Sequence, residues 1–407
     1  MKRISQALIS VQDKRDVVEL AAFLAKRDVS IISMGATAKL LERNKIKVTE
    51  ISRLTGFSDM LNDHINALHP VIYGALLCPR NDPAHMDCLK SLGVDPIDLV
   101  IVNTPPFQPS DIDDETGKKW QEVLSQISVS GISLIRAAAR NFPDVAILTD
   151  PDQYKPVMEE MEKRDMQVSL ETRKKLALKA FELLVSYDME VHKFLAKKFH
   201  QEEQFHNTLL LKYEKAYDLR YGENPHQKAA FYREPDFEGA SLSNAEQLWG
   251  KSLSYNNVAD MDAALKIVME FDKTAVAVVK HGNPIGVAVD RDTTRAYMKA
   301  RDVDQASAFG SVVAFNDTVE KKTAKELTTT FIEAVVSPRF TEGAVEEIKK
   351  GVRGKHMRVI QLTTGKRMKQ VKEVDVRKVS GGLLVQDSDF LLLPRGGHLK
   401  VLTKRKP

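Results

Sequence analysis

Residues 30–44 read SIISMGATAKLLERN. They place a short apolar strand, a glycine turn and an amphipathic helix in direct succession. The same alternation continues on both sides of this stretch. A helical pattern covers residues 16–26, and further strands are expected at 7–11, 47–51, 99–102 and 145–148. Strands separated by helices predict an α/β fold in which a doubly wound parallel sheet carries helices on both faces.

Length and composition narrow the class of protein. The chain has 407 residues, too many for one hydrophobic core, so two or three domains are expected. A net charge of +4 suits an anionic small substrate and does not by itself indicate nucleic acid. The basic run over residues 349–378 lacks interleaved aromatic residues and is interpreted as a solvated surface.

Cysteine usage and hydropathy bear on compartment and metal binding. Two cysteines exclude a disulfide scaffold and favour a reducing compartment. His85 lies between Cys78 and Cys88 with a spacing that matches no standard zinc pattern, so no metal is predicted. A signal-peptide apolar region and an apolar run of about 18 residues are both absent, which predicts a cytoplasmic protein without membrane attachment.

The pattern changes near the middle of the chain. A long helical pattern over residues 169–199 closes the first domain, and the polar segment 199–209 connects it to a second, mixed α/β unit. We therefore place one domain at 1–198 and another at 199–407. In the second domain, strands are expected at 275–279, 312–315, 334–337 and 358–362, and helices at 259–270 and, capped by Thr323, at 324–334.

The glycine turn of the opening stretch is a candidate anion site. Free N–H groups at a helix N-terminus attract phosphate, and glycine lets the anion approach closely. Residues at the end of the preceding strand face the same place. An ordinary strand-to-helix turn capped by threonine explains the pattern too, and both readings stay open. The candidate phosphate-binding residues are Ser10, Lys14, Ser33, Gly35 and Thr37.

Two stretches of the second domain also carry candidate chemistry. A buried strand ends at Lys280-His281, before a turn signal over residues 282–284. A neutral imidazole takes a proton and an ammonium group holds developing negative charge, although an exposed Lys and a hydrogen-bonded His explain the pair equally well. In RYGENPHQ, at residues 220–227, Arg220 offers a fork for phosphate or carboxamide and Tyr221 a stacking face. A surface turn is the alternative.

These motifs resemble one family of enzymes. RYGENPHQ at 220–227, LSYNN at 253–257, VVKHGNPIG at 278–286, SAFG at 307–310 and GGLLVQD at 381–387 are similar to the bifunctional purine-biosynthesis enzymes. These join a phosphoribosylaminoimidazolecarboxamide (AICAR) formyltransferase to an inosinate (IMP) cyclohydrolase. In the first half, SVQDK, TAKLL, LHP and RAAARN, at residues 10–14, 37–41, 68–70 and 136–141, resemble the cyclohydrolase domain. The resemblance runs in order from about residue 4 to 387.

The resemblance implies a fold and a reaction. The first domain is expected to have the methylglyoxal-synthase-like fold, and the second to be the cytidine-deaminase-like first lobe of the formyltransferase. The implied enzyme moves a formyl group from 10-formyltetrahydrofolate, as co-substrate, to the 5-amino group of AICAR. His281 would be the base and Lys280 would stabilise the oxyanion or assist the departing folate nitrogen. A homodimer, no nucleic acid and no membrane are expected. The implied substrate-binding residues are Arg220, Tyr221, Asn256, Gly310 and Glu333.

The first domain departs from the family at its cyclohydrolase site. Groups that orient the formamide and shift protons are replaced, so we expect a degenerate domain kept as scaffold. Where the family has Arg and Lys before LHP, a Tyr in NLYPF, and Asp and Gly in DIGG, this chain has His64, Asn66, Pro105, Ser128 and Ser130; Met34 and Ala36 interrupt the STGGT phosphate loop.

The second domain departs differently. The family continues beyond GGLLVQD, whereas this sequence ends at Pro407, so we expect the second lobe to be missing and the apolar run 390–393 to be exposed. Three interpretations follow. The chain is a formyltransferase and cyclohydrolase by descent, or a non-catalytic relative that binds a purine-precursor nucleotide or a partner carrying a separate C-terminal lobe, or a truncated product without an independent role.

Overall fold

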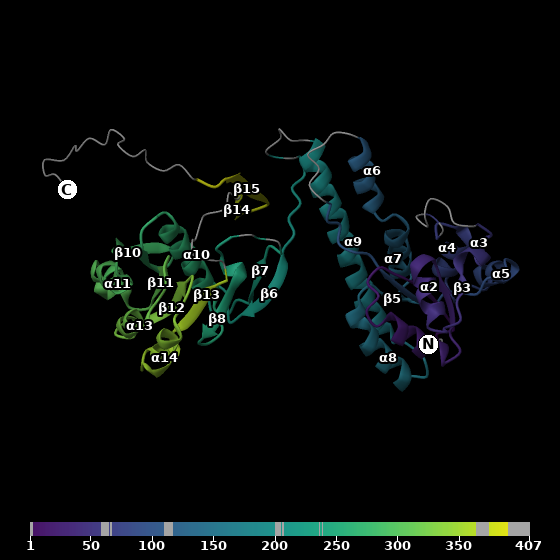
Figure 1. Cartoon of the computed structure of the whole chain (residues 1–407), viewed down its shortest axis with the longest axis horizontal. Coiled ribbons are helices and arrows are strands. Elements are labelled where there is room, and N and C mark those ends of the chain that lie inside the picture. Colours follow the sequence, from purple (N-terminus) through teal and green to yellow (C-terminus); the bar gives the residue numbers. More distant parts are fainter. Residues whose placement is uncertain are drawn as a thin grey trace. The chain divides into compact units, whose positions relative to one another are not determined.

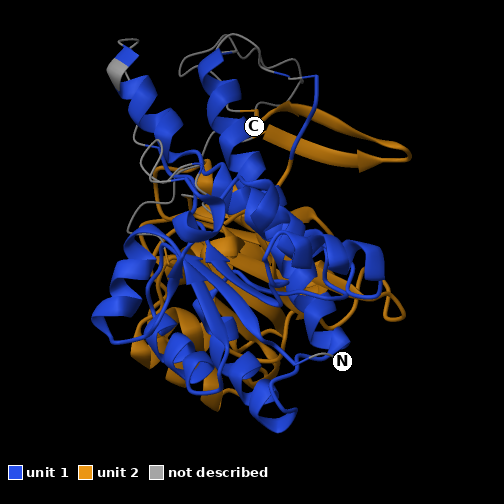
Figure 2. Cartoon of the chain, turned by 90° about the vertical axis from the view of Figure 1, so that its right-hand side faces the viewer, with its two compact units in different colours: residues 1–210 blue, residues 211–407 orange. Residues whose placement is uncertain are grey.

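The computed structural model describes residues 3–57, 65, 67–109, 117–199, 205, 207–235, 237, 239–363 and 374–389. It divides into two compact units, Met1–Leu210 and Leu211–Pro407, which are described separately (Figures 1 and 2). The boundary predicted after residue 198 lies one residue before the end of helix α9 (Leu170–Phe199). The connecting residues 200–204 and 206 and the apolar run 390–393 lie outside the described residues.

Unit 1 is built on a five-stranded sheet whose strands are all parallel, as the alternating pattern predicts. The strand order is β3-β2-β1-β4-β5, so the chain first moves outward from β1 on one side and then crosses to its other side. The carboxyl ends of β1 and β4 therefore form the switch point at which such sheets bind ligands. The strands are β1 (Gln6–Val11), β2 (Ser30–Ser33), β3 (Thr49–Glu50), β4 (Leu99–Asn103) and β5 (Ala146–Leu148).

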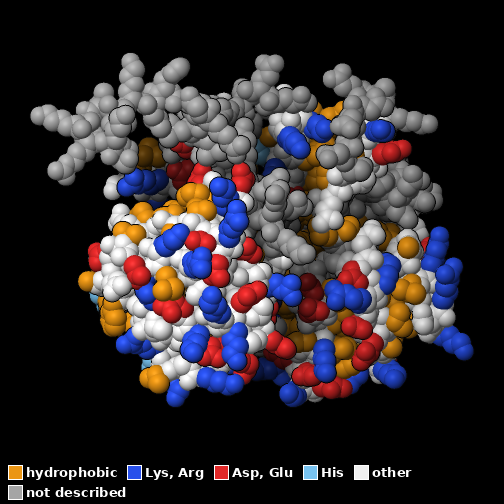
Figure 3. Space-filling model, turned by 60° about the vertical axis from the view of Figure 1, so that its left-hand side comes forward, with side chains coloured by type: hydrophobic (Ala, Val, Ile, Leu, Met, Phe, Trp, Pro, Cys, Tyr) orange, Lys and Arg blue, Asp and Glu red, His pale blue; other side chains and the backbone are white. Residues whose placement is uncertain are grey.

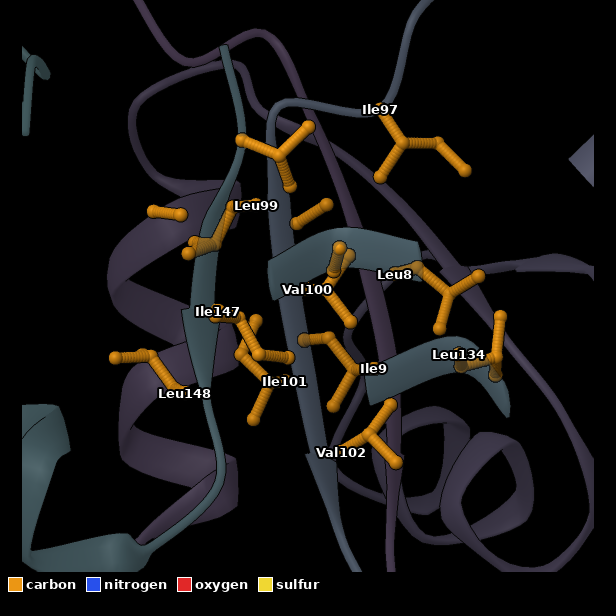
Figure 4. Close-up of a cluster of buried hydrophobic side chains, with 14 of the residues drawn as sticks. Leu8, Ile9, Ile97, Leu99, Val100, Ile101, Val102, Leu134, Ile147 and Leu148 are labelled. Atoms are coloured by element: carbon orange, nitrogen blue, oxygen red, sulfur yellow. The ribbon is translucent and has the colours of Figure 1, made fainter. Parts of the chain in front are cut away.

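Helices cover both faces of this sheet, and its central strands are consequently buried over almost their whole length. Figure 4 shows branched side chains of β1, β4 and β5 packed together, among them Leu8, Ile101 and Ile147. The strand predicted at 47–51 is shorter, because Ile51 already begins a helix. Besides α9, the helices are α1 (Val17–Ala25), α2 (Gly35–Arg43), α3 (Ile51–Thr55), α4 (Pro70–Leu77), α5 (Pro83–Ser91), α6 (Gly117–Gln126), α7 (Ser130–Arg140) and α8 (Tyr154–Lys163).

Unit 2 contains a six-stranded mixed sheet of order β10-β9-β11-β12-β13-β8. Strands β11, β12 and β13 are parallel to one another, while β9 runs antiparallel to β11. Each face of the sheet has its own apolar cluster. The strands are β8 (Ala245–Trp249), β9 (Ala275–Lys280), β10 (Asn283–Val289), β11 (Ser311–Phe315), β12 (Ile332–Ser337) and β13 (Arg358–Leu362).

Helices flank this sheet, and two hairpins lie outside it. Helix α10 packs on β9, β11 and β12, and α11 packs on β9 and β10. The helices are α10 (Tyr255–Met269), α11 (Thr293–Asp302), α12 (Gln305–Ala308), α13 (Lys321–Leu327) and α14 (Glu342–Lys350). The hairpins pair β6 (Glu214–Leu219) with β7 (Ala229–Arg233) and β14 (Val374–Val379) with β15 (Gly382–Asp387).

Two local predictions are wrong. The helix predicted over 324–334 spans Lys321–Leu327 instead. A turn follows it, in which the hydroxyls of Thr328 and Thr329 donate to backbone oxygens of the last helical turn at 2.8 Å and 2.7 Å. Thr323 does not cap the helix; its buried hydroxyl hydrogen-bonds Thr294 at 2.9 Å. The turn predicted over 282–284 is also displaced, because Asn283 already pairs with Lys280 in the β9–β10 ladder. Pro284 fits this strand because β10 is an edge strand.

Removing a core side chain of β1 should destabilise unit 1. Leu8 is fully buried in the central sheet, so Leu8→Ala should lower the free energy of unfolding by about 2–5 kcal/mol in urea titrations. Leu178→Ala on α9 is the matched control, because that side chain is 62% exposed. Equal losses in the two variants would contradict this packing.

Candidate functional site

The predicted phosphate loop of unit 1 opens into a cavity of about 510 Å³ at the switch point of the sheet. Four of the five candidate residues line it: Ser10, Lys14, Gly35 and Thr37. Gly35 begins α2 with φ 53°, in the left-handed region that favours glycine. Ser33 is not part of the lining. It is fully buried, and its Oγ donates a hydrogen bond to the backbone oxygen of Ile9 at 2.7 Å, so its role is to join β2 to β1.

Lys14 supplies the positive charge of this cavity. Its Nζ donates to Thr37 Oγ1 at 2.7 Å and to the backbone oxygen of Val11. Burial lowers the pKa of the Lys14 amine, because the charged form loses solvation. The N-terminus of α2 adds free backbone N–H groups to the same wall. The cavity thus has two independent sources of attraction for an anion.

The departures from the family motif meet at this same cavity. Pro105, Ser128 and Ser130 line it, together with Met34 and Ala36 of the loop. His64 and Asn66 lie outside the described residues. Among the described lining residues, Lys14 is the one side chain that titrates; the others are hydroxyl, amide or apolar groups. Such a lining holds an anion and hydrogen-bonding groups, but it offers no carboxylate or imidazole for proton transfer.

In unit 2, the Lys280-His281 pair lies where β9 turns back into β10. His281 and Gly282 form a two-residue turn with φ 53° and 72°, the signs of a type I′ hairpin turn. Asn283 Nδ2 donates to the backbone oxygen of His281 at 2.9 Å. The turn bends the backbone directly after Lys280, which removes the strict alternation of side chains along an extended strand. His281 is exposed and Lys280 is half-buried.

Lys280 reaches the start of the neighbouring strand. Its Nζ donates to the backbone oxygen of Phe309 at 2.7 Å. Gly310 follows with φ 76°, and a β-carbon there would lie 4.0 Å from the Lys280 amine. The ring of Phe309 is 57% exposed beside this point and contacts Phe331. Lys280, Gly310 and an exposed aromatic face therefore share one edge of the sheet.

The first turn of α10 holds the segment that carries Arg220 and Tyr221. The backbone nitrogen of Tyr255 donates to the backbone oxygen of Tyr221 at 3.2 Å. The backbone nitrogen of Arg220 donates to the backbone oxygen of Leu253 at 3.0 Å. Asn256 Nδ2 donates to the backbone oxygen of Glu223 at 3.3 Å. The RYGENPHQ and LSYNN motifs, far apart in sequence, thus form one structural unit.

Asp260, which was not predicted from the sequence, lies one turn along α10 from Asn256. Its carboxylate accepts hydrogen bonds from the backbone nitrogens of His281, at 3.2 Å, and Gly282, at 2.7 Å. The available signal was its four-residue spacing from Asn256, which places both side chains on one face of the helix. Helix α10 therefore contacts both the Arg220 segment and the turn of the Lys280-His281 pair.

Glu333 lies at the start of β12, at the same end of the strands where β9 ends and β11 begins. Its Oε2 accepts a hydrogen bond from Arg358 Nη1 at 2.6 Å. The Arg358 side chain is only 5% exposed and also bonds the Ser252 oxygen at 3.4 Å. The interpretation of residues 349–378 as a solvated surface is therefore wrong for Arg358. Residues 364–373 of that run lie outside the described residues.

Breaking this ion pair should destabilise unit 2. Glu333→Ala leaves the Arg358 guanidinium buried without its carboxylate, which should cost about 3 kcal/mol in denaturant unfolding. Glu246→Ala, on the exposed part of β8, is the control and should change the free energy of unfolding by less than about 0.5 kcal/mol. A Glu333→Ala loss as small as the control's would show that the pair does not support the sheet edge.

Charge, hydropathy and metal-ligating groups of the described residues bear on the partners of the chain. On the face drawn in Figure 3, Lys and Arg side chains are interspersed with Asp and Glu. None of the described helices combines the length and hydropathy needed to cross a bilayer. Within the same residues, His, Cys, Asp and Glu form no group of three that would ligate a metal ion.

Almost the whole chain is similar in sequence to known proteins. Residues 138–407 match the family model AICARFT/IMPCHase bienzyme, and residues 16–133 match the MGS-like domain. The bifunctional purine biosynthesis protein PurH of Persephonella marina is 41% identical over 99% of this chain and 76% of that protein. PurH of Acetivibrio thermocellus is 42% identical over 99% of this chain and 77% of that protein. The solved structure of ForH aligns with 47% of this chain and 99% of its own at 29% identity and a TM-score of 0.43.

Proposed function

We propose a function from one premise: this chain belongs to the AICARFT/IMPCHase bienzyme family. It is an enzyme of purine biosynthesis, and formyl transfer to AICAR is its reaction. The family joins this reaction to IMP cyclohydrolysis. We assign formyl transfer to unit 2 and treat the cavity of unit 1 separately, because the two sites differ in the side chains that they offer.

The convergence of Lys280, Gly310 and the Arg220 segment around α10 carries the assignment of formyl transfer. In the proposed step, the 5-amino nitrogen of AICAR attacks the formyl carbon of 10-formyltetrahydrofolate. A C–N bond forms, the bond from that carbon to the folate nitrogen breaks, and one proton passes from the amine to the departing nitrogen. The amine is conjugated with the imidazole ring and is a poor nucleophile, so a base is required. His281 takes the proton, and Lys280 holds the negative charge on the formyl oxygen.

The surrounding groups would hold the nucleotide. Arg220 is exposed, and its guanidinium carbon lies 5.4 Å from the centre of the Tyr221 ring. The guanidinium suits a phosphate, and the ring suits a flat base. Glu333 accepts a hydrogen bond from Arg358 through Oε2. Its other carboxylate oxygen would accept a hydrogen bond from the carboxamide of the nucleotide. Asn256 fixes the loop at Glu223 and would act through that loop. Glycine at position 310 permits the left-handed φ of 76° that precedes β11 beside the Lys280 amine.

The folate co-substrate, the homodimer and a reducing compartment belong to the same proposal. The family supports the first two. Cys78 and Cys88 are both free thiols, which supports a reducing compartment such as the cytoplasm. No metal enters the proposed step, since Lys280 supplies the positive charge.

For unit 1 we propose that the cavity keeps phosphate-ester binding and has lost cyclisation. Lys14 and the start of α2 attract the phosphate, while hydroxyl and amide groups face the rest of the ligand. Ring closure requires proton transfers at the formamide and carboxamide, and the described lining has no acid or base suited to them near neutral pH. The substitutions at Pro105 and Ser128, which predict a degenerate cyclohydrolase domain, support the same proposal.

Replacing either member of the pair should slow formyl transfer strongly. His281→Ala and Lys280→Ala should each reduce the rate of 10-formyltetrahydrofolate-dependent AICAR formylation by about 10²–10⁴-fold. AICAR affinity, measured by calorimetry, should change little, because the Arg220 segment is untouched. Lys325→Ala, on the exposed side of α13, is the charge-matched control. Wild-type chain that binds AICAR without turning it over would instead favour the non-catalytic or partner-dependent relative.

The cavity of unit 1 should bind a nucleotide without converting it. Purified protein incubated with formylated AICAR should form no IMP above the uncatalysed rate. IMP itself should bind, and Lys14→Ala should weaken that binding by about tenfold, whereas Lys39→Ala, on the exposed side of α2, should not. Affinity should fall as the pH rises through the Lys14 pKa, which burial places below its ordinary 10.5. Catalysed IMP formation would contradict the loss of cyclisation.

A further inference from the structure

The turn that carries His281 adopts a conformation that histidine does not favour by itself. His281 has φ 53°, where its β-carbon crowds the backbone carbonyl. Glycine meets no such penalty, and Gly282 takes the second left-handed position of the turn. A type I′ turn prefers Asn, Asp or Gly at both positions, so His281 is a costly choice for the first one. Such a residue persists only where its surroundings hold it, as functional sites often do.

The side chain of Asp260, on helix α10, holds this turn in place. Its two carboxylate oxygens each accept one backbone hydrogen bond, Oδ2 from His281 at 3.2 Å and Oδ1 from Gly282 at 2.7 Å. Bonds to a charged acceptor are stronger than neutral ones, and two of them fix both the position and the tilt of the turn. Asn283 adds a bond to the carbonyl oxygen of His281. The imidazole itself is left exposed and available.

The position of Asp260 on α10 gives this contact a second consequence. One turn earlier, Asn256 bonds the backbone of Glu223, and Tyr255 bonds that of Tyr221. A single rigid helix thus contacts the segment assigned to the nucleotide and the turn assigned to proton transfer. In the proposed function, α10 would therefore set the distance between the substrate amine and the imidazole.

We propose that Asp260 is a positioning residue: it holds the left-handed His281–Gly282 turn on helix α10 and so fixes the imidazole relative to the nucleotide. The proposal rests on the function proposed for unit 2. Misplacement of a reacting group by about 1 Å costs roughly 100-fold in rate, so loss of these two bonds should appear mainly in kcat.

The kinetic test compares three changes in the full chain. Asp260→Asn keeps one acceptor oxygen and should lower kcat for AICAR formylation by about tenfold, while Asp260→Ala removes both oxygens and should lower it by about 100-fold. KM for AICAR should change by less than about threefold in both, because the hydrogen bonds that hold the Arg220 segment come from Leu253, Tyr255 and Asn256. Asp262→Asn is the matched control, an exposed carboxylate of the same helix that pairs with Lys266 at 2.8 Å.

A second background separates positioning from general stability. In the His281→Ala variant, where the imidazole is gone, Asp260→Asn should reduce the residual rate by less than about twofold, because groups that act as a unit are not additive. A merely structural role predicts the same loss with and without the imidazole. Equal losses in the two backgrounds, or an unchanged kcat in Asp260→Ala, would overturn the proposal.

Amide hydrogen exchange tests the contact without requiring activity. The backbone N–H groups of His281 and Gly282 should exchange about tenfold faster in Asp260→Asn than in the wild-type chain and the Asp262→Asn control. Unchanged exchange would overturn the proposal. If the wild-type chain shows no formyl transfer but the exchange rates respond as expected, the proposed function fails while the contact of Asp260 with the turn stands.

Discussion

The central strands of both sheets are covered on two faces, and this constraint decides where chemistry can occur. A polar side chain inside β1, β4, β9 or β11 would lose its hydration without gaining a partner, so these strands are almost entirely apolar. Candidate functional groups accordingly lie at the strand ends and on the helices and loops beside them. In unit 1 they lie at the carboxyl ends of β1 and β4. In unit 2 they lie where β9 ends and where β11 and β12 begin.

The same constraint explains how much of the fold the sequence predicts. Short apolar runs such as Val276–Val279 are strong local signals, because a strand buried on both faces tolerates little else. Glycine turns mark the strand ends. The local sequence pattern therefore suffices to place Gly35 and Lys280 where a strand ends. The helix predicted over 324–334 is wrong beyond Leu327, because the apolar residues of this segment belong to the end of α13 and the start of β12, and the three threonines at 328–330 between them have low helix propensity. Periodicity in a short segment does not separate a helix from a strand.

Contacts between distant segments could not be predicted in this way. Asp260 looks like any exposed acidic residue of an amphipathic helix until β9 is placed beside α10. Arg358 looks like one charge in a basic run until β12 brings Glu333 to it. Ser33 was expected at the phosphate site because of its neighbours, yet its hydroxyl turns into the sheet and bonds the backbone of Ile9. In each case a partner far away in sequence decides the role of the side chain.

The two candidate sites offer different groups. The cavity of unit 1 has a lysine and a helix N-terminus but no carboxylate or imidazole in its described lining. Unit 2 has the Lys280-His281 pair, which we propose as the reacting groups, and the backbone contacts that hold its turn. Helix α10 adds a constraint on length as well as on residue identity. Each residue advances a helix by about 100°. One residue inserted between Asn256 and Asp260 would therefore swing one of their two contacts off the face that both now share, even if every side chain of the site were retained.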